Sequence, residues 1–244
     1  MGKLIYTPKG AAREYSQYAF NGFVGCSGLC RYCYNRKGIT AKVLGANTPI
    51  LRKCFKDIPD AVKKYKKELQ KNLVEYQKHG IFFSFVGDPL SEKTKELTEK
   101  LIYENWLYGI ESILLTKQID WIKDFDFDLF ETVDDKNISF GFTLTGIDEL
   151  EKGCPSNLER IEALKILHKK GFNTWVSLEP VISFKKSLEM YRLSAPYVDV
   201  YKIGLESGKH YDKRDVKSFI ENILYPDFKV KGAIIFKKSI QKYL

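Results

Sequence analysis

The sequence predicts an α/β protein built around a parallel sheet, and three observations favour this fold class. Segments rich in β-branched and aromatic residues alternate with segments of helical periodicity, as in strand–helix–strand crossovers. No low-complexity segment, internal repeat or Pro/Ser-rich linker interrupts the 244 residues, so we expect a single domain over residues 1–244. Polar or reactive residues follow nearly every expected strand, which favours a β/α barrel over an open doubly wound sheet.

Seven segments are expected as strands because they are short and rich in β-branched or aromatic residues. In chain order they are residues 19–24, 81–86, 112–116, 138–145, 174–178, 198–204 and 229–236. Six of them end in, or are followed by, polar or reactive residues: the first cysteines, Gly87-Asp88, Thr116-Lys117, Thr143 and Thr145, Glu179, and Glu206. The carboxyl ends of barrel strands gather functional groups in this way.

Six segments between these strands carry apolar residues at helical spacing and are expected as helices. They are residues 60–78, 92–108, 119–130, 157–170, 185–192 and 215–224. The fourth has the clearest end signals, because Ser156 and Glu159 form a capping box and Gly171 follows the last turn. Its expected buried stripe consists of Leu158, Ile161, Leu164 and Leu167.

Charge and hydropathy exclude some classes of protein. The 40 basic and 31 acidic residues give a formal net charge of +9, but only seven of the basic residues are arginines, which phosphate recognition favours. The lysines of residues 60–78 lie mostly off the apolar stripe, as on a solvated helix face. No run of 18 uncharged apolar residues is present, and the first 20 residues lack the apolar core of a signal peptide. We therefore expect a soluble, cytoplasmic protein without a membrane partner.

Three of the five cysteines fall within eight residues, at Cys26, Cys30 and Cys33. An odd number of cysteines in a reducing compartment argues against a disulfide framework. The C-x3-C-x2-C spacing allows three thiolates to converge, and no histidine is near enough in sequence to complete a local zinc site. On a four-iron cluster, three thiolates leave one iron open, as catalysis requires. A zinc-stabilised loop that borrows Cys54, Cys154 or a distant histidine is the structural alternative, and three unrelated buried thiols are another.

With Tyr32, the array becomes C-x3-C-x-aromatic-C, and the sequence here resembles the radical S-adenosylmethionine enzymes. The resemblance extends toward the branch that includes spore photoproduct lyase. It rests on residues 6–15 (YTPKGAAREY), 83–92 (FSFVGDPLSE), 114–117 (LLTK) and 151–182, and it covers most of residues 6–182.

This resemblance implies a partial (β/α)6 TIM-type barrel with one [4Fe–4S] cluster, held in a loop of about residues 25–35. Cys26, Cys30 and Cys33 would bind three irons, and S-adenosylmethionine would chelate the fourth through its amino and carboxylate groups. An external reductant of the flavodoxin or ferredoxin type would supply one electron. The resulting 5′-deoxyadenosyl radical would abstract hydrogen from an unidentified substrate, for which a nucleic acid or nucleotide is one candidate.

The resemblance also implies contacts to the cofactor. Tyr32 is expected near the adenine, and Lys117 near the cofactor carboxylate. Gly87 and Asp88 stand where the family meets the methionine ammonium, because glycine permits close backbone approach and a carboxylate suits a cation. Val86 replaces the usual first glycine of that segment. A turn-forming Asp-Pro and an ordinary surface lysine are the competing interpretations of Asp88 and Lys117.

Further site residues are expected at Thr145 and Glu179, for the ribose hydroxyls or the substrate, with Glu179 also a catalytic candidate. Photoproduct lyase places its hydrogen-donating cysteine where this chain has Phe85 and Val86. Cys154 is the candidate substitute, with a buried, incidental thiol as the alternative. Thymine-dimer repair is therefore not expected.

Two other function classes fit parts of the sequence. A nucleic-acid-binding protein would use the +9 charge and the aromatic residues as stacking platforms, and its binding would depend steeply on salt. A zinc-stabilised scaffold would use the same three cysteines structurally, and chelators would unfold it.

Overall fold

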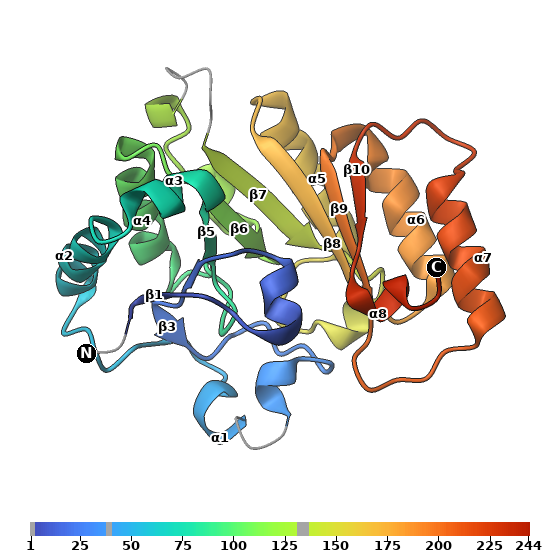
Figure 1. The fold of residues 1–244 in the computed structure, drawn as a ribbon, viewed down its shortest axis with the longest axis horizontal. Coiled ribbons are helices and arrows are strands. Elements are labelled where there is room, and N and C mark those ends of the chain that lie inside the picture. The colour runs from blue at the N-terminus through green and yellow to red at the C-terminus, as the bar shows by residue number, and fades with distance from the viewer. Residues whose placement is uncertain (1–2, 38–40, 131–136) are drawn as a thin grey trace. The chain divides into compact units, whose positions relative to one another are not determined.

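The computed structural model describes residues 3–37, 41–130 and 137–244 (Figure 1). The chain divides into two compact units. The first comprises Met1–Ser139 and Glu151–Cys154, and the second comprises Phe140–Leu150 and Pro155–Leu244. The single domain expected over residues 1–244 stays a prediction.

In the first unit, the described strands of the main sheet run in the order β1-β2-β5-β6. They are β1 (Ile5–Tyr6), β2 (Ala19–Phe20), β5 (Ile81–Phe83) and β6 (Ser112–Thr116). β1 is antiparallel to β2, whereas β2, β5 and β6 are parallel, with Phe20 opposite Phe83 and Phe83 opposite Leu114. A separate antiparallel pair, β3 (Phe23–Val24) and β4 (Ile50–Leu51), follows β2 and leads into the first cysteines.

The helices of the first unit are α1 (Ala41–Leu44), α2 (Ile58–Leu69), α3 (Leu73–His79) and α4 (Lys95–Leu107). α2 and α4 pack on each other, and they contact β1 and β6 respectively. Aromatic side chains join α2 to the strands. The ring of Tyr65 on α2 packs edge-on against the ring of Phe20 on β2, with 4.9 Å between the ring centres. The buried Tyr65 hydroxyl donates to Asn105 of α4 at 2.8 Å, and the Asn105 amide donates to Ser112 of β6.

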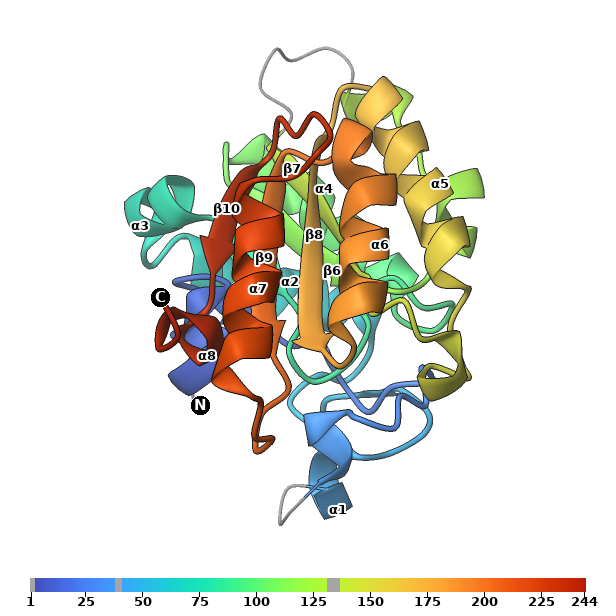
Figure 2. The ribbon, with the colours of Figure 1, turned by 90° about the vertical axis from the view of Figure 1, so that its right-hand side faces the viewer.

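The second unit is built on parallel strands in the order β7-β8-β9-β10. They are β7 (Ile138–Thr143), within which the unit begins, β8 (Asn173–Val181), β9 (Val200–Leu205) and β10 (Ala233–Phe236). The helices are α5 (Asn157–Lys169), α6 (Phe184–Ser194), α7 (Lys213–Leu224) and the short α8 (Lys238–Gln241). Figure 2 shows α6 and α7 side by side in front of the strands, with α6 against β8.

The mostly parallel strands and intervening helices confirm the expected α/β class. The capping box of Ser156 and Glu159 is present and starts α5 as expected. The predicted buried stripe of α5 is confirmed for Ile161, Leu164 and Leu167, which are buried, but is wrong for Leu158, which is 58% exposed.

Several expected boundaries are wrong. Residues 60–78 form two helices, because α2 ends at Leu69 and α3 begins only at Leu73, after Asn72 leaves the helical conformation with φ −150° and ψ 41°. Residues 119–130 form 3-10 turns rather than a helix, because the alternating Asp and Phe residues from 124 to 128 do not present one continuous apolar face. Residues 19–24 split into β2 and β3, which belong to different sheets, and the last strand starts only at Ala233. Among the described residues, no helix combines the length and apolar character needed to cross a bilayer.

Arg160 of α5 is a buried clamp that links α5 to the end of β7 within the second unit. Its side chain is fully buried and donates to the carbonyl oxygens of Thr143 at 2.7 Å and Pro155 at 2.8 and 3.0 Å. We predict that Arg160→Met lowers the free energy of unfolding by about 2–4 kcal/mol, because buried carbonyls lose their donors. Urea denaturation measures this loss. The matched control is Lys165→Met on the same helix, and equal losses in both variants would contradict the clamp.

Candidate functional site

The cysteine loop, which we define as residues 25–35, follows β3 in the first unit. Its entry depends on Gly25, which has φ +92°, and a Cβ there would lie 2.6 Å from the Thr48 carbonyl oxygen. The Arg36 guanidinium donates to the Cys26 carbonyl at 3.0 Å and closes the loop from its far end. All five cysteines of the chain are free thiols.

Gly28 lies among three sulfur atoms. Its N–H donates to Cys26 Sγ at 3.4 Å, and its carbonyl accepts from the thiols of Cys30 and Cys154, each at 3.5 Å. A Cβ at Gly28 would lie 3.1 Å from Cys154 Sγ, 3.4 Å from Cys26 Sγ and 3.7 Å from Cys30 Sγ. A side chain at this position would therefore occupy the space that the sulfur atoms face.

Cys154 reaches the cysteine loop through the Glu151–Cys154 segment, which belongs to the first unit although the residues on both sides belong to the second. The Gly153 N–H donates to the Gly28 carbonyl at 3.2 Å, and the Gln118 amide donates to the Gly153 carbonyl at 3.1 Å. A Cβ at Gly153 would lie 2.2 Å from the Ser27 carbonyl oxygen. Only glycine permits this backbone contact.

A buried charged group lies beside the thiols. Tyr32 donates to the carboxylate of Glu151, a residue that is 1% exposed. Lys117 Nζ lies 4.0 Å from Glu151 Oε1 and 5.6 Å from the centre of the Tyr32 ring. Burial opposes the charged form of Lys117, but Tyr32, Cys30, Glu151 and Cys154 together raise its pKa well above the usual range. Lys117 is therefore a fixed cation of the site, not a surface lysine.

The environment distinguishes the thiols. The hydrogen bond from Cys154, followed by the charge of Lys117, lowers the pKa of Cys30 against the effect of burial. The same hydrogen bond and burial raise the pKa of Cys154. Burial and the nearby Asp88 carboxylate raise the pKa of Cys26, while the backbone N–H of Asp88 donates to its sulfur and acts in the opposite direction.

Asp88 follows β5 and ties it to the end of β6. Its carboxylate accepts from the Thr116 hydroxyl at 2.6 Å, the Lys117 N–H at 2.8 Å and the Leu90 N–H at 3.0 Å. A carboxylate offers about four acceptor positions, so one further donor can be accommodated. Asp88 has the turn-forming role, because its carboxylate accepts from the Leu90 N–H. Its remaining acceptor position is available to a cation such as an ammonium group.

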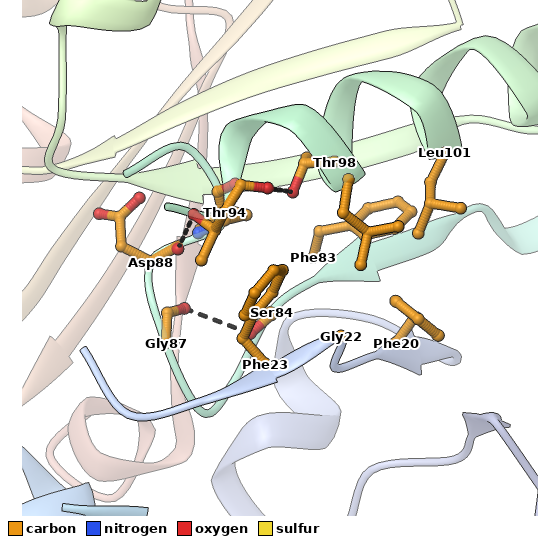
Figure 3. Close-up of a pocket in the computed structure, with 12 residues that line it drawn as sticks. Phe20, Gly22, Phe23, Phe83, Ser84, Gly87, Asp88, Thr94, Thr98 and Leu101 are labelled. Carbon is orange, nitrogen blue, oxygen red and sulfur yellow. Dashed lines mark hydrogen bonds between the residues drawn. The ribbon is translucent and has the colours of Figure 1, made fainter. Parts of the chain in front are cut away.

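Gly87 makes its close backbone approach to the cysteine loop, because a Cβ there would lie 2.6 Å from the Gly25 carbonyl oxygen. Figure 3 shows Gly87 accepting from the Ser84 hydroxyl, and the Thr94 hydroxyl donating to the Asp88 carbonyl. A small pocket opens here between β5 and α4, lined mainly by apolar side chains that include Phe20, Phe23, Phe83 and Leu101. The Asp88 carboxylate points away from them (Figure 3).

Two expected site residues, Thr145 and Glu179, belong to the second unit. Thr145 is fully buried, and its hydroxyl accepts from the Ile147 N–H at 3.3 Å. Glu179, at the end of β8, accepts from Lys237 Nζ at 2.5 Å, and the Lys237 side chain is 3% exposed. A Cβ at Gly204 would lie 2.7 Å from Glu179 Oε1, so glycine makes room for this carboxylate on β9.

The structure therefore brings most of the expected site residues together in the first unit. Those whose contacts link them to the cysteine loop are Cys26, Cys30, Tyr32, Gly87, Asp88, Lys117 and Cys154. Sequence reasoning missed Glu151 and Lys237. Glu151 stands in a charged Glu-Leu-Glu-Lys stretch that looks solvent-exposed, and Lys237 lies in the C-terminal region where the family resemblance is loose.

The described residues contain no group of three or more His, Cys, Asp or Glu side chains spaced to hold a metal ion. A four-iron cluster is wider than one ion, so its thiolates need not converge as closely. The donor set is suited to such a cluster: free thiols in one loop, a side-chain-free face at Gly28, and backbone N–H groups directed at Cys26.

The ion pair of Glu179 and Lys237 generates a stability prediction. Lys237→Met should lower the free energy of unfolding by about 2–4 kcal/mol, because it removes the buried cation beside a largely buried carboxylate. The double variant Glu179→Gln/Lys237→Met should regain at least about half of this loss in urea denaturation. The exposed Lys229→Met is the control. Additive losses in the double variant would contradict the pairing.

No protein-family model matches the sequence. An uncharacterised protein of Methanocaldococcus jannaschii, MJ0683, is 27% identical over 241 residues, which cover 94% of this chain and 85% of that protein.

The fold is similar to two sets of solved structures. Spore photoproduct lyase complexed with dinucleoside spore photoproduct matches with a TM-score of 0.66 and 13% identity, over 96% of this chain and 79% of the lyase. Streptococcus suis SuiB bound to S-adenosylmethionine matches with a TM-score of 0.60 and 14% identity, over 89% of this chain. This chain spans about half of SuiB, 46% of its length. The chain therefore has the α/β fold of the radical S-adenosylmethionine enzymes, a mostly parallel, partial TIM-type barrel, as the sequence predicts.

Proposed function

We propose that this protein is a radical S-adenosylmethionine enzyme with one [4Fe–4S] cluster on Cys26, Cys30 and Cys33. The observation that carries the proposal is the cysteine loop, in which free thiols face the side-chain-free Gly28 near the largely buried Lys117. When bound, the reduced cluster supplies one electron that splits S-adenosylmethionine into methionine and a 5′-deoxyadenosyl radical. An external one-electron reductant supplies that electron.

The chain's own residues prepare the thiolates. The N–H groups of Gly28 and Asp88 donate to Cys26 Sγ and stabilise its negative charge. Cys30 lies within the field of Lys117, which favours its thiolate. On balance only the pKa of Cys30 is lowered, because burial and the Asp88 carboxylate raise the pKa of Cys26. A cluster requires deprotonated cysteines, so Cys30 is the thiol that its surroundings prepare for one.

The same residues offer complementary charges to the cofactor's amino-acid moiety. Lys117 would hold its carboxylate, and the remaining acceptor position of Asp88 would accept an N–H from its amino group. Tyr32 would contact the adenine with its ring, since its hydroxyl is bound to Glu151. Gly87 would keep the backbone close to this region.

The remaining site residues are assigned by their surroundings. Glu179, paired with Lys237, is the candidate for contacts to the ribose or the substrate and for a catalytic role. Thr145 holds the turn after β7 and has no exposed surface, so we give it a positioning role. Cys154 is the candidate hydrogen-atom donor or ligand because it lies beside Cys30.

The first test is anaerobic reconstitution with iron and sulfide, followed by reduction. We predict about four irons per chain and an electron paramagnetic resonance signal that changes when S-adenosylmethionine is added, with formation of 5′-deoxyadenosine. Cys30→Ala should abolish all three results, whereas the matched Cys54→Ala should keep them. A colourless protein with stoichiometric zinc and no 5′-deoxyadenosine would overturn the proposal in favour of a structural metal clip.

The second test addresses Lys117. Lys117→Met should raise the concentration of S-adenosylmethionine needed for the spectral change by about tenfold or more, because it removes a buried cation from the cofactor carboxylate. The iron content should stay at the wild-type value. Lys93→Met is the control for a lysine outside the site. An unchanged cofactor affinity in Lys117→Met would contradict the assigned contact.

A further inference from the structure

Cys154 lies against the cysteine loop, and its sulfur contacts Gly28. Among the atoms around Gly28, its Sγ would be the nearest to a Cβ, at 3.1 Å, ahead of Cys26 and Cys30. Cys154 and Cys30 also donate to the same carbonyl oxygen, that of Gly28. A thiol from 126 residues further along the chain thus faces the same space as two cysteines of the loop.

The segment that carries Cys154 is fixed at both ends. Gly153 makes the backbone contact to Gly28, and the Cys154 N–H donates to the Glu151 carbonyl at 2.9 Å. The buried Glu151 carboxylate in turn binds Tyr32 and Lys117. These contacts fix residues 151–154 against the cysteine loop.

The chemistry of the expected cluster gives this fourth thiol a role. Three cysteines on four irons leave one iron without a protein ligand, and soft iron favours thiolate sulfur. A fourth thiolate would add one negative charge, and the segment that carries Cys154 also carries Glu151, whose Oε1 lies 4.0 Å from the Lys117 cation. The geometry therefore brings a fourth sulfur donor and a cation to the same segment.

We propose that Cys154 is a fourth thiolate ligand, which binds the otherwise open iron until S-adenosylmethionine displaces it. This inference rests on the proposed function. In the exchange, the bond between iron and Cys154 sulfur would break, the cofactor's ammonium group would lose a proton, and bonds from iron to the amino nitrogen and carboxylate oxygen would form. The oxidation state of the cluster would not change, and the released Cys154 thiolate would take up the proton that the ammonium group loses. Cys154 would thus protect the resting cluster and set the affinity for the cofactor.

The test compares wild type with Cys154→Ala and Cys154→Ser, with Cys54→Ala as the matched control, each reconstituted anaerobically with 57Fe. Without S-adenosylmethionine, Mössbauer spectra of wild type and Cys54→Ala should show four similar irons. The two Cys154 variants should show one distinct iron and, after brief oxidation, about threefold or more of the three-iron species. They should bind S-adenosylmethionine about tenfold more tightly, because no thiolate must be displaced. Gly153→Ala, which separates the segment from Ser27, should reproduce these effects.

Spectra and cofactor affinity identical to wild type in Cys154→Ala would overturn the inference, and wild-type formation of 5′-deoxyadenosine would then still support the proposed function. Loss of hydrogen transfer with unchanged spectra would assign Cys154 as a hydrogen-atom donor instead. Complete loss of iron in Cys154→Ala, with iron retained in Cys33→Ala, would make Cys154 one of three essential ligands and would also overturn it. Failure of wild type to bind a cluster would defeat the proposed function itself.

Discussion

The backbone contact between Gly28 and Gly153 is the constraint on which the candidate site depends. The Gly153 N–H donates to the Gly28 carbonyl, and a Cβ at either glycine would meet the opposing segment or its sulfur atoms. This contact brings the Glu151–Cys154 segment against the cysteine loop, so that thiols distant in sequence face the same space. A larger residue at position 153 would collide with the Ser27 backbone, which cannot move aside as a flexible side chain can.

Around this contact, buried charges determine what the site can bind. Lys117 is a cation held among Tyr32, Glu151 and two cysteines, and Asp88 joins the ends of β5 and β6 through the Lys117 N–H. A largely buried cation and a carboxylate with one free acceptor position are complementary to the carboxylate and amino group of an amino acid. The charge of Lys117 also favours the thiolate of Cys30.

Local sequence signals predicted the parts of the fold that local physics determines. β6 has the expected bounds, and α5 starts at its capping box, because each depends on residues near in sequence. The helix predicted for residues 119–130 was wrong, because the spacing of the aromatic residues resembled that of a helix, while the aspartates and tertiary packing favoured 3-10 turns. Among site residues, Lys117 and Asp88 could be found because they follow strands. Glu151 and Lys237 could not, because their burial depends on contacts with residues 119 and 58 positions away.

The central claim is that the cysteine loop holds iron in a cluster beside Lys117. Anomalous diffraction from crystals grown without oxygen, recorded on both sides of the iron and zinc absorption edges, tests it most directly. The account predicts a compact group of iron atoms bounded by the sulfur atoms of Cys26, Cys30 and Cys33. A single zinc atom at these sulfurs, or no metal at all after reconstitution, would contradict it.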